Sequence, residues 1–263
     1  MFLNNNNTPS SYFLQFILGI IFNNIVKLKA MKAIIMAGGK GTRLAPLTND
    51  IPKPLVKIID KPVMQCIIEL LKSHNITDIG VTLMYKANKI IDYFGDGSKF
   101  GVKLTYFIEH EPLGTAGSVK SALNFLSDTF LVLSGDAYTD INLSKAIEFH
   151  YAKNSLFTIV STPHQNPVGL GVLEADHNGK IIKFIEKPEI SKPSLINCGI
   201  YIIDKLAFEN TKDGFYDFGK ELIPSLINKE LYSFVTYDYW SDIGTLPSYY
   251  QTNYLVASKA SYL

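Results

Sequence analysis

From Met31 onward, short apolar runs alternate with stretches whose apolar residues recur at helical spacing. Such alternation of strands and helices is typical of α/β proteins. Because parallel strands need a crossover between them, the pattern predicts a mostly parallel sheet with helices on both faces. The strands are expected at 32–36, 79–84, 104–108, 130–133 and 156–161, and the helices at 62–75, 89–94, 118–126 and 143–153.

The pattern changes after Pro163, where runs 171–175 and 180–185 flank Asn178-Gly179, a strong signal for an antiparallel hairpin. Beyond it we expect a strand at 195–203, a helix at 219–228, a strand at 232–237 and a closing helix from Pro247. The predicted fold is therefore α/β. It is a Rossmann-like, mostly parallel mixed sheet flanked by helices, with an antiparallel insertion, in one domain spanning 31–263.

Residues 1–30 differ from this domain, because they contain no acidic residue and carry only Lys27 and Lys29 as charges. Their longest unbroken apolar run, 16–22, is shorter than a membrane span, and Asn23 and Asn24 interrupt it. No small-x-small cleavage site follows, as a secretory signal would need. We therefore expect a dispensable N-terminal extension, with a peripheral membrane anchor as the alternative.

The overall composition favours a folded globular protein. Apolar residues make up 47% of the chain and charged residues 19%, which excludes a disordered or collagen-like chain. A net charge of +1 does not favour nucleic acid as a partner. Cys66 and Cys198 lie far apart, so neither a disulfide framework nor a zinc site is predicted, and a cytoplasmic location is expected.

A glycine-rich segment, 37–44 (AGGKGTRL), follows the first expected strand. It is neither a Walker A loop nor the dinucleotide fingerprint, because Leu44 stands where the third glycine of that fingerprint would be. Glycines there let backbone N–H groups approach a phosphate, although a tight strand-to-helix turn explains them equally well. Arg43, and Lys53 between Pro52 and Pro54, favour binding of a polyanion.

Residues 38–58 (GGKGTRLAPLTNDIPKPLVKI) resemble the signature of the sugar-1-phosphate nucleotidylyltransferases, also called nucleoside-diphosphate-sugar pyrophosphorylases. Further segments that resemble the family's motifs, in the family's order, are 111–117, 134–136, 186–188, 197–199 and 240–245. Among such enzymes the chain looks most like the bacterial mannose-1-phosphate guanylyltransferases. The resemblance covers about residues 31–255.

The resemblance implies a role for each matching residue. The implied nucleotide-binding residues are Ala37, Gly38, Gly39, Gly41, Thr42, Arg43, Lys53, Glu111, Gly114 and Thr115. The implied sugar-phosphate-binding residues are Gly171, Glu186, Lys187 and Asn197. Arg43, Lys53 and Asp136 are the implied catalytic residues, and Asp136 and Asp242 the implied ligands of Mg²⁺.

The expected reaction joins a nucleoside triphosphate and a sugar 1-phosphate into a nucleoside-diphosphate sugar and pyrophosphate. The resemblance to mannose-1-phosphate guanylyltransferases makes GTP and mannose 1-phosphate the favoured pair. Guanine also suits Glu111, because its carboxylate could accept from the N1–H and N2 amino group of that base. Backbone N–H groups of Gly114 and Thr115 could donate to O6. The family's Tyr-Gly-Val is Leu170-Gly171-Val172 here, which leaves the identity of the sugar open.

Each residue also has an ordinary structural explanation when it is taken alone. A lysine such as Lys53 or Lys187 is usually exposed, and Asp136 or Asp242 could simply cap a turn. The motifs favour catalysis because all of them occur together. The alternatives are a glucose-1-phosphate uridylyl- or thymidylyltransferase and, in another class, a non-catalytic homologue that binds nucleotide sugars. Whether the chain forms a homo-oligomer stays open.

Overall fold

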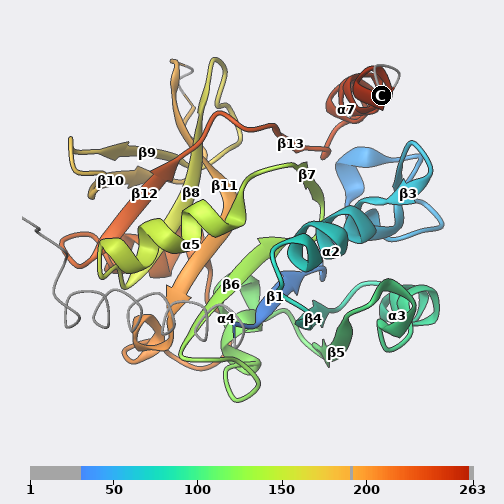
Figure 1. Ribbon diagram of the computed structural model, residues 1–263, viewed down its shortest axis with the longest axis horizontal. Coiled ribbons are helices and arrows are strands. Elements are labelled where there is room, and N and C mark those ends of the chain that lie inside the picture. The colour runs from blue at the N-terminus through green and yellow to red at the C-terminus, as the bar shows by residue number, and fades with distance from the viewer. Residues whose placement is uncertain (1–30, 190–191, 261–263) are drawn as a thin grey trace, which may run out of the picture.

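A computed structural model describes residues 31–189 and 192–260 (Figure 1). The expected N-terminal extension, 1–30, lies outside the described residues. Within them, the largest sheet has nine strands, with β10-β9-β11-β6-β1-β4-β5 along its main path and β8 joining β11 to β12. The chain is therefore the α/β protein with a mixed sheet that its sequence predicts.

The parallel half of the sheet is built from buried apolar strands. β1 (Ala33–Met36) lies between β4 (Asp78–Leu83) and β6 (Thr129–Ser134), and β5 (Lys103–Ile108) pairs with β4 at the edge. All four strands run parallel, as the helical segments between them require. Helices pack against both faces, so the strands are apolar on both sides.

Adjacent residues of β1 contact opposite layers, because side chains alternate along a strand. Ile35 belongs to the core cluster that also contains buried residues of α2 (Val63–Ser73), α3 (Ala87–Phe94) and α5 (Leu143–Ala152). Ile34 packs with the layer that contains α4 (Gly114–Ser121). Figure 1 shows α2 and α5 in front of the sheet and α4 behind it.

The antiparallel half follows the predicted change of pattern. β11 (Ser194–Asp204) runs antiparallel to β6, and β9 (Val172–Ala175) and β10 (Ile181–Ile185) form a hairpin beside it. Gly179, in the loop of this hairpin, has a φ of +84°, a conformation that glycine adopts without strain. β8 (Phe157–His164) and β12 (Leu231–Val235) complete this half.

Two short ladders were not predicted. β2 (Lys57–Ile58) pairs with β3 (Lys61–Pro62), and β7 (Ala137–Thr139) pairs with β13 (Trp240–Asp242). Each of these strands is only two or three residues long, so no periodic pattern marks it. The β7–β13 ladder brings together two segments more than 100 residues apart and thereby builds part of the site.

Two helices differ from their expected positions. The predicted helix 118–126 is α4 at Gly114–Ser121, and the predicted helix 219–228 is a π-helical turn, Phe218–Leu222, followed by the short α6, Ile223–Ser225. The α4 prediction began too late because Gly114 and Gly117 are poor helix formers. They are tolerated because residues 214–216 pack directly against them: the N–H of Gly117 donates to the carbonyl of Tyr216 at 2.9 Å.

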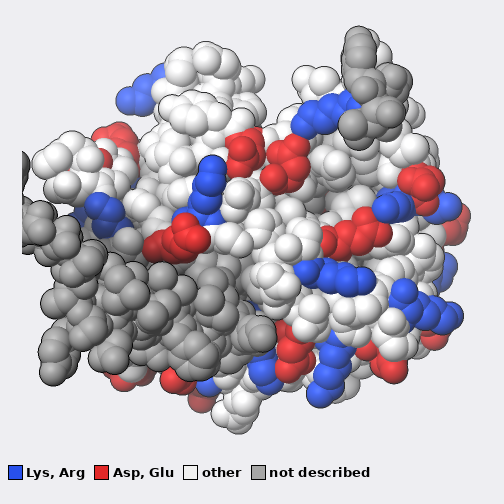
Figure 2. All heavy atoms as spheres, viewed as in Figure 1, with Lys and Arg blue, Asp and Glu red and all other residues white. Residues whose placement is uncertain are grey.

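The closing helix, α7 (Leu246–Ala260), begins one residue before its predicted start. No helix in 31–189 or 192–260 is long and apolar enough to cross a membrane. Basic and acidic side chains are interspersed on the face that Figure 2 shows, and neither sign forms a large patch there.

Candidate active site

The glycine-rich loop leaves β1 and turns sharply at Gly41. Gly41 has a φ of +64°, and a Cβ there would lie 2.9 Å from Cβ of Lys53. The Thr48 hydroxyl donates to the carbonyl of Gly41 at 2.9 Å and holds the turn. Glycine is therefore needed at this position both for backbone conformation and for space, and the result is close packing of the loop on Lys53.

Lys53 is buried, with only 4% of its surface exposed. Its Nζ lies 2.9 Å from Oδ2 of Asp136 and 2.9 Å from Oδ1 of Asp242. A short 3-10 turn, Lys53–Leu55, carries it, and Pro52 and Pro54 restrict the backbone on either side. A buried lysine between two carboxylates is not an ordinary surface lysine.

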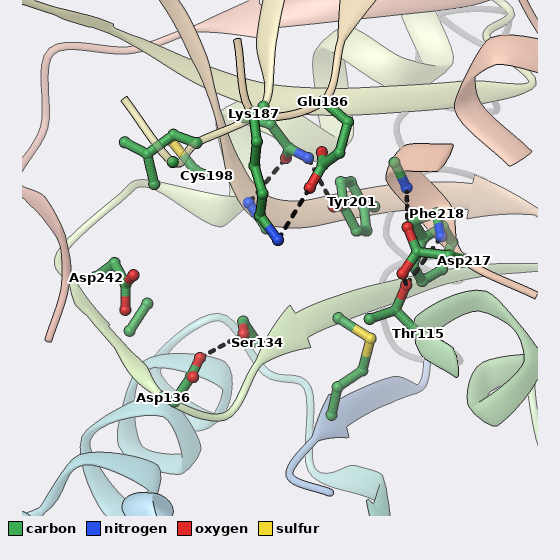
Figure 3. A pocket seen from close by; sticks show the side chains of 18 of the residues that line it. Thr115, Ser134, Asp136, Glu186, Lys187, Cys198, Tyr201, Asp217, Phe218 and Asp242 are labelled. Carbon is green, nitrogen blue, oxygen red and sulfur yellow. Dashed lines mark hydrogen bonds and ion pairs between the residues drawn. The ribbon is translucent and has the colours of Figure 1, made fainter. Parts of the chain in front are cut away.

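The ends of two strands, β6 and β13, position the two aspartates. Asp136 follows the carboxyl end of β6, and Asp242 ends β13. In the β7–β13 ladder, Asp242 lies opposite Ala137, the residue after Asp136. Figure 3 shows both side chains at the same end of the cavity. The ladder thus fixes the separation of two carboxylates that are far apart in sequence.

The charges around Asp136 favour its ionised form. Burial opposes ionisation, but the neighbouring Lys53 ammonium and hydrogen bonds from Lys53 and from the Ser134 hydroxyl outweigh it, so the pKa of Asp136 lies below its ordinary value. Arg43 Nη2 lies 3.6 Å from Oδ2 of Asp242, and its side chain is 68% exposed. Arg43 can therefore swing toward a bound anion, whereas Lys53 is fixed.

One cavity, of about 400 Å³, lies between the glycine-rich loop and the start of α4. The predicted nucleotide-binding residues that line it are Ala37, Gly38, Gly39, Gly41, Lys53, Gly114 and Thr115. Thr42 is exposed and is not part of the lining, and Arg43 lines the neighbouring cavity. The structure therefore brings most, but not all, of the predicted set together.

Of the two neighbouring glutamates, Glu109 lines this cavity and Glu111 does not. Glu111 is exposed, in the segment between β5 and α4. Oε2 of Glu109 accepts a hydrogen bond from the backbone N–H of Leu113 at 3.3 Å. Burial raises the pKa of Glu109, and that N–H lowers it to a smaller extent. The structure therefore differs from the prediction, because Glu111 lies outside this cavity and Glu109 lines it.

A second cavity, of about 260 Å³, adjoins the first. The residues of the predicted sugar-phosphate set all line it, and they are Gly171, Glu186, Lys187 and Asn197. Figure 3 shows Glu186 and Lys187 side by side in this cavity. Nζ of Lys187 lies 3.5 Å from Oε1 of Glu186. Lys187 has a φ of +51°, a conformation that a non-glycine residue adopts only rarely and that is concentrated at functional sites.

The two cavities meet at shared lining residues, which are Met36, Thr115, Ser134, Asp136 and Asp217. A ligand in each cavity would therefore face the other across Asp136. This arrangement suits a transfer between two bound molecules, because it holds the reacting groups close together.

Asp217 was not predicted from the sequence. Its Oδ2 accepts from the Thr115 hydroxyl at 3.0 Å, and it lines both cavities. The sequence contained only a weak signal for it. Asp217 lies just before the predicted helix 219–228, and an acidic residue in that position is more often a helix cap than part of a binding site. Phe215, exposed at the rim of the first cavity, was also missed.

Cys198 lines the second cavity but is buried, and burial raises the pKa of its thiol, so it is not an activated nucleophile.

A family model described as "Nucleotidyl transferase" matches residues 32–259. The chain belongs to this family. It is 39% identical over 240 residues to a UTP–glucose-1-phosphate uridylyltransferase of Synechocystis, covering 84% of this chain and 62% of the relative. It is 38% identical over 220 residues to a mannose-1-phosphate guanyltransferase of Yarrowia lipolytica, covering 81% and 61%. The chain thus spans about three fifths of the length of these curated relatives.

Solved structures also align with this chain. The crystal structure of HddC from Yersinia pseudotuberculosis superposes with a TM-score of 0.77 at 32% identity, covering 86% of this chain and 99% of that chain. The structure of HddC complexed with GMP-PN superposes with a TM-score of 0.76.

Asp136 and Asp242 have the right chemistry to hold a divalent cation. Their oxygens converge on one positive group, the Lys53 ammonium, and carboxylate oxygens are the ligands that Mg²⁺ prefers. Within 31–189 and 192–260 no cluster of three or more His, Cys, Asp or Glu side chains forms a cage. In phosphoryl-transfer sites Mg²⁺ is usually held by one or two carboxylates together with the substrate phosphates.

Proposed function

We propose that the chain catalyses nucleotidylyl transfer from a nucleoside triphosphate to a sugar 1-phosphate. The observation that carries the proposal is the position of Asp136, paired with Lys53, at the junction of a cavity lined by the glycine-rich loop and a cavity lined by Glu186 and Lys187. Two phosphate-bearing substrates fit such a site better than one, because each cavity has its own cationic side chain.

In the proposed reaction, a phosphate oxygen of the sugar 1-phosphate forms a bond to the α-phosphorus, and the bond from that phosphorus to the bridging oxygen of the β-phosphate breaks. Pyrophosphate leaves with that oxygen and its electron pair. The attacking phosphate is already ionised at neutral pH, so no side chain needs to remove a proton. The protein contributes position and positive charge, which dominate catalysis of phosphoryl and nucleotidyl transfers.

Each cation has a distinct place in this scheme. Lys187 holds the phosphate of the sugar in the second cavity, and the exposed Arg43 closes on the triphosphate. Lys53 is fixed by two carboxylates and places its charge beside the α-phosphate. A bound Mg²⁺ at Asp136 and Asp242 would neutralise charge on the phosphates in the transition state.

Guanine and mannose are our proposed base and sugar. An ionised Glu109 in the nucleotide cavity could accept from both donors on guanine, as was predicted for Glu111. The similarity to a mannose-1-phosphate guanyltransferase and to HddC, which was solved with GMP-PN, supports this choice. The 39% identity to a uridylyltransferase makes UTP with glucose 1-phosphate the second candidate.

A substrate panel tests the proposal. Pyrophosphate release is measured for the full chain with GTP, UTP, dTTP, ATP and CTP, each with mannose 1-phosphate and with glucose 1-phosphate. We expect the highest kcat/KM for GTP with mannose 1-phosphate. A higher value for UTP or dTTP with glucose 1-phosphate would overturn the base and sugar while leaving the reaction class in place.

A further inference from the structure

The carboxylate of Glu186 lies in a slot between two glycines from different segments, Gly171 before β9 and Gly219 in the π-helical turn. A Cβ at position 219 would lie 2.3 Å from Oε2 of Glu186 and 2.7 Å from its Cδ. A Cβ at position 171 would lie 3.1 Å from the same oxygen. We call this space the glycine slot. It leaves no room for a side chain at position 219 while Glu186 keeps its present orientation.

Backbone conformation does not explain the glycine at position 219. Its φ is not in the left-handed region, so any residue could adopt it. Glycine also weakens a helical turn relative to alanine. The turn is of the π type, with the N–H of Leu222 donating to the carbonyl of Asp217 at 3.0 Å, a geometry found frequently at functional sites. Space for the Glu186 carboxylate is therefore the reason for glycine here.

The backbone of this turn is held on several sides. Oδ1 of Asp217 accepts from the N–H of Gly219 at 2.9 Å and from that of Lys220 at 3.0 Å. The Thr115 hydroxyl donates to Oδ2 of Asp217 at 3.0 Å (Figure 3). Phe218 is buried in the core. Because the turn cannot retreat, a methyl group at position 219 would displace the end of the Glu186 side chain.

We propose that Gly219 is a positioning residue that aims the Glu186 carboxylate into the sugar cavity. The inference rests on the proposed function, since it assumes that a sugar 1-phosphate occupies this cavity. In its present orientation Glu186 places Oε1 3.5 Å from Nζ of Lys187, so one side chain can meet the sugar while its neighbour meets the phosphate (Figure 3). Moving Glu186 would disturb sugar binding and leave the triphosphate unaffected.

The test compares Gly219→Ala with wild type in the full chain. We expect KM for the sugar 1-phosphate to rise at least about tenfold and KM for the nucleoside triphosphate to change less than about twofold. Lys220→Ala is the matched control, because Lys220 is exposed, does not line the sugar cavity and lies in the same turn. An equal rise of both KM values, or no change in either, would overturn the inference.

A double-mutant cycle separates positioning from general damage. Glu186→Gln is introduced into wild type and into Gly219→Ala. We expect a marked rise of KM for the sugar 1-phosphate in wild type and little further rise in Gly219→Ala, because the carboxylate is already displaced there. Additive effects would contradict the positioning role.

Direct binding distinguishes the two proposals. Titration calorimetry with mannose 1-phosphate and with glucose 1-phosphate is carried out on wild type and on Gly219→Ala. If wild type binds neither and transfers no nucleotide, the proposed function fails. If wild type binds one and Gly219→Ala binds it equally well, the positioning role alone fails.

Discussion

The ammonium of Lys53 lies 2.9 Å from a carboxylate oxygen of Asp136, at the junction of two cavities. Asp242 reaches the same ammonium from β13, so one buried cation serves two carboxylates. The opposite charges of the lysine and the two aspartates stabilise one another. Removing the lysine would leave two partly buried carboxylates without a cation.

The two lysines should affect different substrates. Lys53→Ala should lower kcat/KM for the triphosphate by about 10²-fold or more, because a fixed charge beside the α-phosphate is lost. Lys187→Ala should mainly raise KM for the sugar 1-phosphate. Steady-state kinetics with each substrate varied in turn checks both expectations. Lys57→Ala, an exposed lysine of β2, is the control. Wild-type behaviour of both variants would show that the site is elsewhere.

Lys53→Ala should also reduce stability. Without the ammonium, Asp136 and Asp242 repel each other, at a cost of about 1–3 kcal/mol because both carboxylates keep some access to solvent. Urea unfolding at pH 7 measures this cost. The double variant with Asp242→Asn removes the repulsion and should recover part of the loss. A Lys53→Ala protein as stable as wild type would argue against the paired cluster.

The aspartates should be needed for metal-dependent activity. Asp136→Asn and Asp242→Asn should fold and yet lose about 10²-fold or more in kcat, because a carboxamide is a poor ligand for Mg²⁺. EDTA should abolish wild-type activity, and added Mg²⁺ should restore it. Asp92→Asn, an exposed aspartate of α3, should match wild type. Full activity in the presence of chelator would refute the metal requirement.

Glu109 and Glu111 should differ in their effect on base choice. Glu109→Gln should lower the ratio of kcat/KM for GTP over UTP by about tenfold or more, because an amide cannot accept from both donors of guanine. Glu111 is exposed and outside the nucleotide cavity, so Glu111→Gln should change this ratio much less. A larger effect of Glu111→Gln would show that Glu111, as the sequence motif predicts, is the residue that recognises guanine.

Buried His150 should make stability depend on pH. Burial lowers the pKa of His150 to about 4, whereas in the unfolded chain it takes up a proton near its ordinary value of about 6.5. Between these values the unfolded state binds more protons, so stability falls as pH falls from 7 to 5, by about 2 kcal/mol from this group. The contribution is complete above pH 6.5 and is lost by about pH 4.

Urea unfolding at pH 7 and pH 5 measures the effect. His150→Gln should show a smaller difference between the two pH values than wild type does. His177→Gln, at an exposed histidine in the β9–β10 hairpin, should leave the difference unchanged. The same pH dependence in His150→Gln would contradict the assignment.

The fold could be predicted largely from local pattern. The strands of the parallel half are short, mainly apolar runs that alternate with helical segments, and the β9–β10 hairpin has an Asn-Gly turn, so each signal is local. The start of α4 could not be predicted, because Gly114 and Gly117 disfavour a helix in isolation. Contacts with residues 214–216 overcome that preference, and no local pattern contains them.

The candidate site, like the fold, could be predicted only in part from the sequence. Motifs marked Asp136, Asp242 and Lys53, but a sequence says nothing about distance, and their mutual contact depends on the two short strands β7 and β13. Glu109 and Glu111 are two residues apart, and which of them enters the cavity depends on where the chain turns after β5. Asp217 and Gly219 act through tertiary contacts with Thr115 and Glu186, which no local pattern shows.

Phosphorus NMR of one reaction mixture tests the central claim most directly. The full chain is incubated with GTP, mannose 1-phosphate and Mg²⁺, and with the UTP and glucose 1-phosphate pair in parallel. Nucleotidylyl transfer predicts that the triphosphate and sugar-phosphate signals fall together while pyrophosphate and a sugar-linked diphosphate appear in equal amounts. Release of inorganic phosphate with no sugar-linked diphosphate, or unchanged spectra with both pairs, would contradict the account.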